Sequence, residues 1–149
     1  MEWTDEVLKM NPRKLIVSVS LDGGKDLHDE IRGVPGGFKK TLETYRQLQE
    51  IKHPRFEVYA GLTLSGYNVD HFDAIVQELR DSVPGFEPKD LHINIAQHSE
   101  HFYENTGLDM SFQAKAYDII QKFRKTKGFH LSPVQIIEDR YLQLVPHYI

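Results

Sequence analysis

Cysteine is absent from all 149 residues of the chain. This absence excludes disulfides, a thiolate nucleophile, and any zinc or iron–sulfur site whose cysteine ligands would come from this chain. It also fits a reducing compartment, where disulfides are rare.

Long apolar runs and blocks of positive charge are missing as well. No segment approaches the roughly 18 apolar residues that cross a bilayer, and the N-terminal segment MEWTDEVLKMNPRK has no apolar core of a secretory signal. The formal net charge is −4, and there is no run of five or more basic residues. We therefore expect a cytoplasmic protein without a membrane or nucleic-acid partner.

What is present is a regular alternation of apolar segments. Short runs rich in β-branched residues predict strands over residues 14–21, 56–64 and 91–96. The first run, KLIVSVSL, is nearly continuous in apolar residues, which is typical of a strand buried on both faces. Apolar residues at helical spacing predict helices over residues 5–10, 38–51, 68–83 and 112–127 and from 132 onward.

Several helix starts carry recognisable caps. Thr4 and Asn68 are suited to cap the first helix and the helix after the second strand. Ser132, Pro133 and Gln135 have the order of a capping box with proline at the first helical position.

Alternating strands and helices predict right-handed crossovers and a parallel sheet, and hence one α/β domain over residues 1–149. Three parallel strands are few, because such a sheet needs neighbours at both edges. The sequence therefore predicts either that this chain is part of a larger protein or that its open edge pairs with another chain.

One segment, residues 19–38 (VSLDGGKDLHDEIRGVPGGF), indicates a ligand site. It joins a strand end to a polar, glycine-rich loop that leads into a helix, a combination that core packing does not require. In parallel α/β folds, sites lie at the carboxyl ends of strands. The polar residues of the segment include Ser20, Asp22, His28, Asp29 and Arg32.

The pattern SLDG…HD..IRG..GGF in this segment resembles the fourth βα unit of radical S-adenosylmethionine (radical SAM) enzymes, in the branch that often carries a C-terminal cluster-binding extension. The second strand with Asn68 resembles the fifth unit, and residues 92–107 resemble the sixth strand and its exit loop. The resemblance covers about residues 15–107. It implies half of a TIM-like partial (β/α)6 barrel, and the last two helices resemble the segment that leads out of the barrel.

The cluster-binding part of that family has no counterpart in this chain. Radical SAM enzymes hold a [4Fe–4S] cluster on three cysteines of a CxxxCxxC loop and reductively cleave S-adenosylmethionine (SAM) to a 5′-deoxyadenosyl radical. The resemblance therefore implies a fragment, or one half of a split enzyme, that contacts SAM and substrate and is inactive alone. A missing N-terminal half-barrel would supply the cluster.

The resemblance also implies site residues. Ser20 would bond the SAM ribose or carboxylate, Arg32 would bind the SAM carboxylate, and Asn94 with the backbone of Ile95 and Ala96 would contact the cofactor and its adenine. Asp22 would contact substrate. We expect no catalytic residue and no metal ligand in this chain.

Structural alternatives exist for each of these residues. Ser20 could bond local backbone, Arg32 could pair with Asp29 or Glu30, and Asp22 could hold the turn. His28 and Asp29 are more typical of residues that order a loop. Candidates beside the main set are Thr63, Ser65 and Gln97, which follow or end the other strands.

Two further sites and two further functions remain open. His92, His98 and His101 form the local histidine cluster, and His98 and His101 could bind zinc with a third ligand. The glycine-rich loop over residues 33–37 could hold a phosphate at a helix start, although it lacks the P-loop lysine. The chain could accordingly be a non-catalytic α/β module that associates through its open edge, or a phosphate-binding α/β protein.

Overall fold

The computed structural model describes residues 2–97, 107, 109–128 and 133–144. Among these residues, no helix combines the length and apolar character needed to cross a membrane. The elements in chain order are α1 (Glu2–Lys9), β1 (Leu15–Leu21), α2 (Lys25–Arg32), α3 (Gly37–Gln49), β2 (Phe56–Leu64), η1 (Val69–His71), α4 (Phe72–Ser82), η2 (Pro88–Asp90), β3 (Leu91–Ile95), α5 (Gln113–Lys127) and α6 (Pro133–Leu144).

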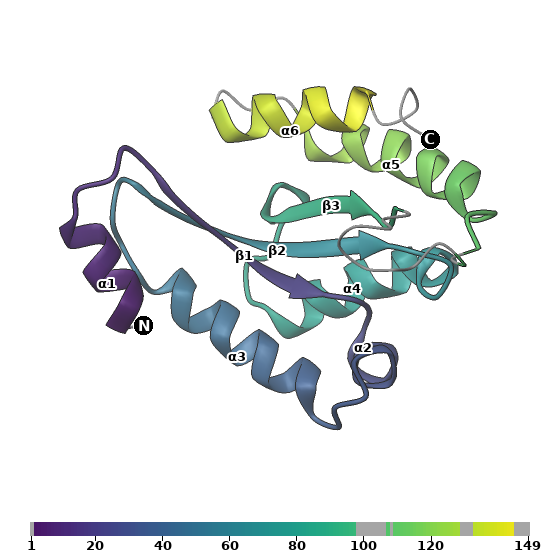
Figure 1. Cartoon of the computed structure of the whole chain (residues 1–149), viewed down its shortest axis with the longest axis horizontal. Coiled ribbons are helices and arrows are strands. Elements are labelled where there is room, and N and C mark those ends of the chain that lie inside the picture. The colour runs from purple at the N-terminus through teal and green to yellow at the C-terminus, as the bar shows by residue number, and fades with distance from the viewer. Residues whose placement is uncertain (1, 98–106, 108, 129–132, 145–149) are drawn as a thin grey trace.

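The described strands form one sheet in the order β1-β2-β3, and both pairs are parallel (Figure 1). Leu15 lies opposite Phe56, and Ala60 lies opposite Leu91. The predicted α/β class with three parallel strands is therefore confirmed. In the part of the chain that the structure describes, the sheet is open and does not close into a barrel.

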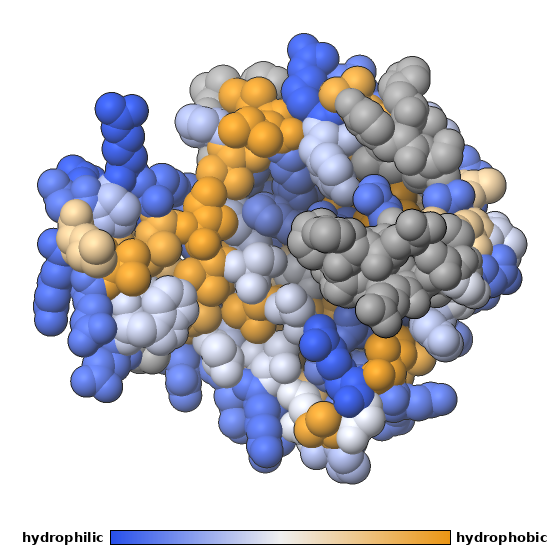
Figure 2. Space-filling view, in the orientation of Figure 1, coloured by the Kyte–Doolittle hydropathy of each residue, from blue (hydrophilic) through white to orange (hydrophobic). Residues whose placement is uncertain are grey.

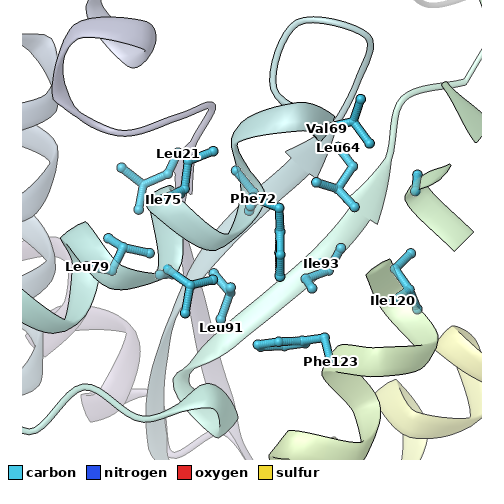
Figure 3. Close-up of a cluster of buried hydrophobic side chains, with 14 of the residues drawn as sticks. Leu21, Leu64, Val69, Phe72, Ile75, Leu79, Leu91, Ile93, Ile120 and Phe123 are labelled. Carbon is cyan, nitrogen blue, oxygen red and sulfur yellow. The ribbon is translucent and has the colours of Figure 1, made fainter. Parts of the chain in front are cut away.

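The hydrophobic core lies between one face of the sheet and the helices α3, α4 and α5. Figure 3 shows side chains of β1, β2 and β3 meeting those of α4 and α5. The rings of Phe72 and Phe123 pack edge to face with centroids 5.4 Å apart, a geometry that aromatic pairs favour. The labelled members are Leu21, Leu64, Val69, Phe72, Ile75, Leu79, Leu91, Ile93, Ile120 and Phe123.

The prediction that the first strand is buried on both faces is wrong. Side chains along β1 alternate between partly buried and exposed, with Ile16, Ser18 and Ser20 on the exposed side. Ile16 is 44% exposed. Helices cover only one face of β1 in the described structure, so its other face, which carries Ile16 and the two serines, contacts solvent instead of a core.

The first helix begins earlier than its predicted cap. α1 starts at Glu2, so Thr4 lies inside it, fully buried, with no hydrogen-bond partner for its hydroxyl among the described residues. Thr4 is therefore not an N-cap. The predicted end of this helix is confirmed, because Asn11 adopts a left-handed conformation with φ of 56°.

The polar segment after β1 contains a helix where the sequence predicts a loop. α2 spans Lys25–Arg32 and ends at Gly33, whose φ of 64° suits glycine. The carboxylate of Glu78 on α4 accepts a hydrogen bond at 3.1 Å from the Lys25 N–H at the start of α2. This contact comes from a distant part of the chain, so local sequence does not reveal it.

The helix predicted from residue 132 is present as α6, which begins at Pro133. Its predicted cap, Ser132, lies outside the described residues.

Candidate functional site

The face of the sheet opposite α3 and α4 carries small polar side chains. Strand register places Ser20 opposite Gly61, and Thr63 opposite Asn94. Because side chains alternate along a strand, Ser18, Ser20, Gly61, Thr63 and Asn94 all belong to this face, which we call the polar face. Ser20 and Asn94 are both exposed, so two predicted SAM-contact residues share one accessible surface.

A glycine keeps the middle of the polar face close to the backbone. A Cβ at position 61 would collide with the hydroxyl of Ser18 on the neighbouring strand. Glycine within a strand commonly marks such a close approach. Gly61 therefore lets the Ser18 side chain lie against β2.

At the carboxyl end of β1, Asp22 and Arg32 form an ion pair between the carboxylate and the guanidinium Nε. The Arg32 side chain is 48% exposed, and that of Asp22 is 19% exposed. The alternative prediction that Arg32 pairs with Asp29 or Glu30 is therefore wrong. Asp22 follows Ser20 by two residues, so the pair lies at the same end of the sheet as Ser20.

The buried His28 side chain fixes the backbone at this end of β1. It is 3% exposed and packs edge-on against Phe38 with ring centroids 5.9 Å apart. Its Nδ1 accepts a hydrogen bond at 3.1 Å from the Asp22 N–H, which requires an unprotonated Nδ1. Burial lowers the pKa of His28 and outweighs the opposing charge of Asp22.

Asp29 orders the loop and the start of α3. Its carboxylate accepts hydrogen bonds from the Gly36 N–H at 2.5 Å and from the Phe38 N–H at 2.7 Å. The bond from Phe38 is the main reason that the pKa of Asp29 is lowered. This carboxylate occupies the helix start where the sequence offered a phosphate site, so the geometry gives that alternative no support.

Asn68 is a site residue whose role sequence reasoning missed. It caps no helix with its side chain, and it is only 1% exposed. Its Nδ2 donates to the carbonyl oxygens of Asp22 and Thr63, both at 2.8 Å, and its Oδ1 accepts from the Ser65 N–H at 2.9 Å. Its position just after a strand end was the available signal, but its partner Asp22, just after β1, is far away in sequence.

The residues at the end of β3 differ in where their side chains lie. Asn94 points to the polar face, whereas the Ile95 side chain lies in the core at 6% exposure. The Ala96 N–H donates to the Leu64 carbonyl at 2.8 Å, so this group is already engaged at the sheet. Gln97, just beyond, is exposed.

His92 lies on the same face of the sheet, opposite Gly61 and therefore in the same row as Ser20. Its ring stacks on Tyr59 with centroids 3.7 Å apart, and its Nε2 is 3.6 Å from the Glu138 carboxylate of α6. Lys127 bonds Glu138 at 2.6 Å and the Leu91 carbonyl at 2.8 Å. Burial is the main cause that lowers the pKa of His92 to about 4. This cluster attaches α6 to the sheet.

His98 and His101, the predicted zinc pair, lie outside the described residues. Within the residues that are described, no three metal-ligating side chains come together.

The residues of this chain do not fit the iron–sulfur cluster of the resembling family, because the chain has no thiolate to ligate iron. The accessible Ser20 hydroxyl, the Asn94 amide and the Asp22–Arg32 pair do supply hydrogen-bond donors and acceptors of the kinds that a ribose, an adenine and an amino-acid group require.

A comparison with known proteins finds similarity to a maturation protein. The chain is 24% identical over 134 residues to the sporulation killing factor maturation protein SkfB of Bacillus subtilis. The match covers 89% of this chain and 31% of SkfB, so the chain spans about a third of that relative's length. No family model matches the chain, and no solved structure matches it. The similarity suggests a relationship to radical SAM enzymes at the level of the family.

Proposed function

We propose that this chain forms the SAM- and substrate-facing part of a radical SAM-type enzyme. The observation that carries the proposal is the joint placement of Ser20, Arg32 and Asn94 around the carboxyl end of an open parallel sheet. The similarity to SkfB over most of the chain supports the same family.

In this proposal Arg32 binds the carboxylate of SAM. Asp22 pairs with the guanidinium through Nε, while the two Nη groups carry further donors that suit a second carboxylate. The Asp22 carboxylate thereby orients Arg32 and stays near enough to contact substrate.

Ser20 contacts the ribose of the cofactor, and Asn94 contacts its adenine. A hydroxyl both donates and accepts, as ribose hydroxyls require, and an amide can pair with an adenine edge. Ser20 and Asn94 lie on β1 and β3, with β2 between them. The backbone of Ile95 remains a proposed adenine contact.

In this proposal the residues of this chain bind and orient SAM and substrate, and they do not transfer electrons. In the family, a cluster on cysteine thiolates supplies the electron that cleaves SAM. We propose that another polypeptide segment provides that cluster, since no residue of this chain is suited to hold it.

Titration of the ¹⁵N-labelled chain with SAM, followed by NMR, tests the proposal. We expect saturable shifts in the amide signals of residues 20–23, 61–65 and 94–96. Ser20→Ala and Asn94→Ala should each weaken binding about tenfold, the effect of losing about 1.4 kcal/mol. Matched controls are Thr44→Ala and Gln47→Ala, on the exposed side of α3, which should bind as the wild type does. The absence of saturable shifts at millimolar SAM would refute the proposal.

A further inference from the structure

Asn68 fastens the ends of two strands to each other. Its side-chain N–H groups reach the carbonyl oxygens of Asp22, just after β1, and Thr63, near the end of β2, each at 2.8 Å. Asp22 and Asn68 are 46 positions apart in the sequence. One buried amide therefore bridges the two strand ends that carry most of the candidate site.

Both polar atoms of this amide form hydrogen bonds. The Oδ1 atom accepts the Ser65 N–H at 2.9 Å while both hydrogens of Nδ2 are donated, so each polar atom of the side chain has a partner. Aspartate has the same shape but would turn an oxygen toward the two carbonyls. Alanine would leave buried backbone groups without partners, which is costly.

The bridge fixes the Asp22 peptide from both sides. His28 accepts its N–H, and Asn68 donates to its carbonyl oxygen. The Asp22 carboxylate, and with it the Arg32 guanidinium, is thereby held at a set position relative to β2. On the other side of β2, the bond from the Ala96 N–H to the Leu64 carbonyl continues the connection to β3.

We propose that Asn68 is a positioning residue: by fixing the spacing of the ends of β1 and β2, it determines how tightly the carboxyl edge of the sheet binds SAM. The inference rests on the proposed SAM-binding function. Asn68 is too deeply buried to touch the ligand, so its influence passes through Asp22 and Thr63.

The experiment separates positioning from stability. Asn68→Ala, Asn68→Asp and Asn68→Ser are compared with Leu48→Ala, a core substitution on α3 at 5% exposure. Urea unfolding gives the stability of each variant, and SAM affinity is measured by NMR at a temperature where each is fully folded. We expect the Ala and Asp variants to bind SAM at least tenfold more weakly. Leu48→Ala should lose comparable stability but keep its affinity within twofold. If Asn68→Ala does not fold, Asn68→Ser, whose hydroxyl retains one donor, carries the test.

Each outcome leads to a different conclusion. If the wild type binds SAM and the folded Asn68 variants bind equally well, the proposed function stands and the positioning role is wrong. If Leu48→Ala loses as much affinity as they do, Asn68 acts through stability alone and the inference also fails. If the wild type does not bind SAM, both the proposed function and this inference are wrong.

Discussion

At the scale of single residues, the site depends on His28 in its neutral form. Its Nδ1 can accept the Asp22 N–H only while unprotonated, and burial makes the charged form unfavourable. Two nearby carboxylates, Asp22 and Asp29, oppose this effect, and Arg32 adds to it. The folded pKa lies below the ordinary value of 6.5.

This lowered pKa predicts a pH-dependent stability. Above about pH 6.5 the stabilisation is complete, because the histidine is neutral in the folded and unfolded states alike. As the pH falls below that value, the unfolded chain takes up the proton first and stability declines until the folded pKa is reached. His28→Asn offers an acceptor oxygen near the Nδ1 position and does not titrate.

Urea unfolding between pH 7 and 5 measures the effect. We expect a smaller decline in the unfolding free energy of His28→Asn than of the wild type. The residual decline comes in part from His92, whose lowered pKa acts in the same direction. Equal declines in the two proteins would show that His28 does not titrate as described.

Residue roles were predictable from the sequence only where the partner is local. The loop-ordering role of Asp29 follows from a carboxylate placed shortly before a glycine-rich helix start, and the structure bears it out. The partner of Arg32 and the role of Asn68 depend on how β1, α2 and β2 meet in space. No local sequence pattern specifies these long-range contacts.

At the scale of elements, apolar periodicity predicted all three described strands within one residue at each end, as well as the long helices. Periodicity failed for α2, which is mostly polar and is held by Glu78 from another helix. The prediction that β1 is buried on both faces was also wrong, because an apolar run does not specify whether other elements pack against both faces of a strand.

The attachment of α6 to the sheet is an element-scale feature that substitution can test. The side chains of Lys127 and Glu138 are each 10% exposed, and burial lowers the pKa of the lysine and raises that of the glutamate despite their pairing. Lys127→Met should cost about 3 kcal/mol, since it leaves a buried carboxylate without its cation. Urea unfolding measures the loss.

The matched control is the exposed pair of Lys115 and Asp70, with side chains 55% and 65% exposed. Lys115→Met should cost far less than Lys127→Met, because exposed ion pairs usually contribute little to stability. The double variant Lys127→Met/Glu138→Gln should recover part of the lost stability. Similar losses for Lys127→Met and Lys115→Met would contradict the described role of the buried pair.

At the scale of the whole molecule, the described sheet is open and leaves β1 at its edge. β1 is an edge strand of the described sheet, and Ile16 projects from its uncovered face. Figure 2 shows hydrophobic surface running from α6 at the top toward the left-hand parts of the strands. On α6, Ile137, Tyr141 and Leu144 are exposed. These features support the proposal that another chain, or another segment of the same enzyme, covers this side.

In isolation the chain should self-associate through this edge. We expect its sedimentation coefficient to rise with concentration, and Ile16→Lys, which places a charge on the edge strand, to abolish the rise. Val34→Lys, at another exposed apolar side chain (48%), should behave as the wild type does. A wild-type chain that stays monomeric at all concentrations would contradict self-association through the edge strand β1.

The proposed SAM site at the carboxyl end of the sheet is tested most directly by intermolecular nuclear Overhauser effects between SAM and the labelled chain. We expect contacts from the methionine part of SAM to Arg32, from its ribose to Ser20, and from its adenine to Asn94 and Ile95. Contacts confined to the helices on the covered face, or no contacts from bound SAM to these residues, would contradict the proposed site.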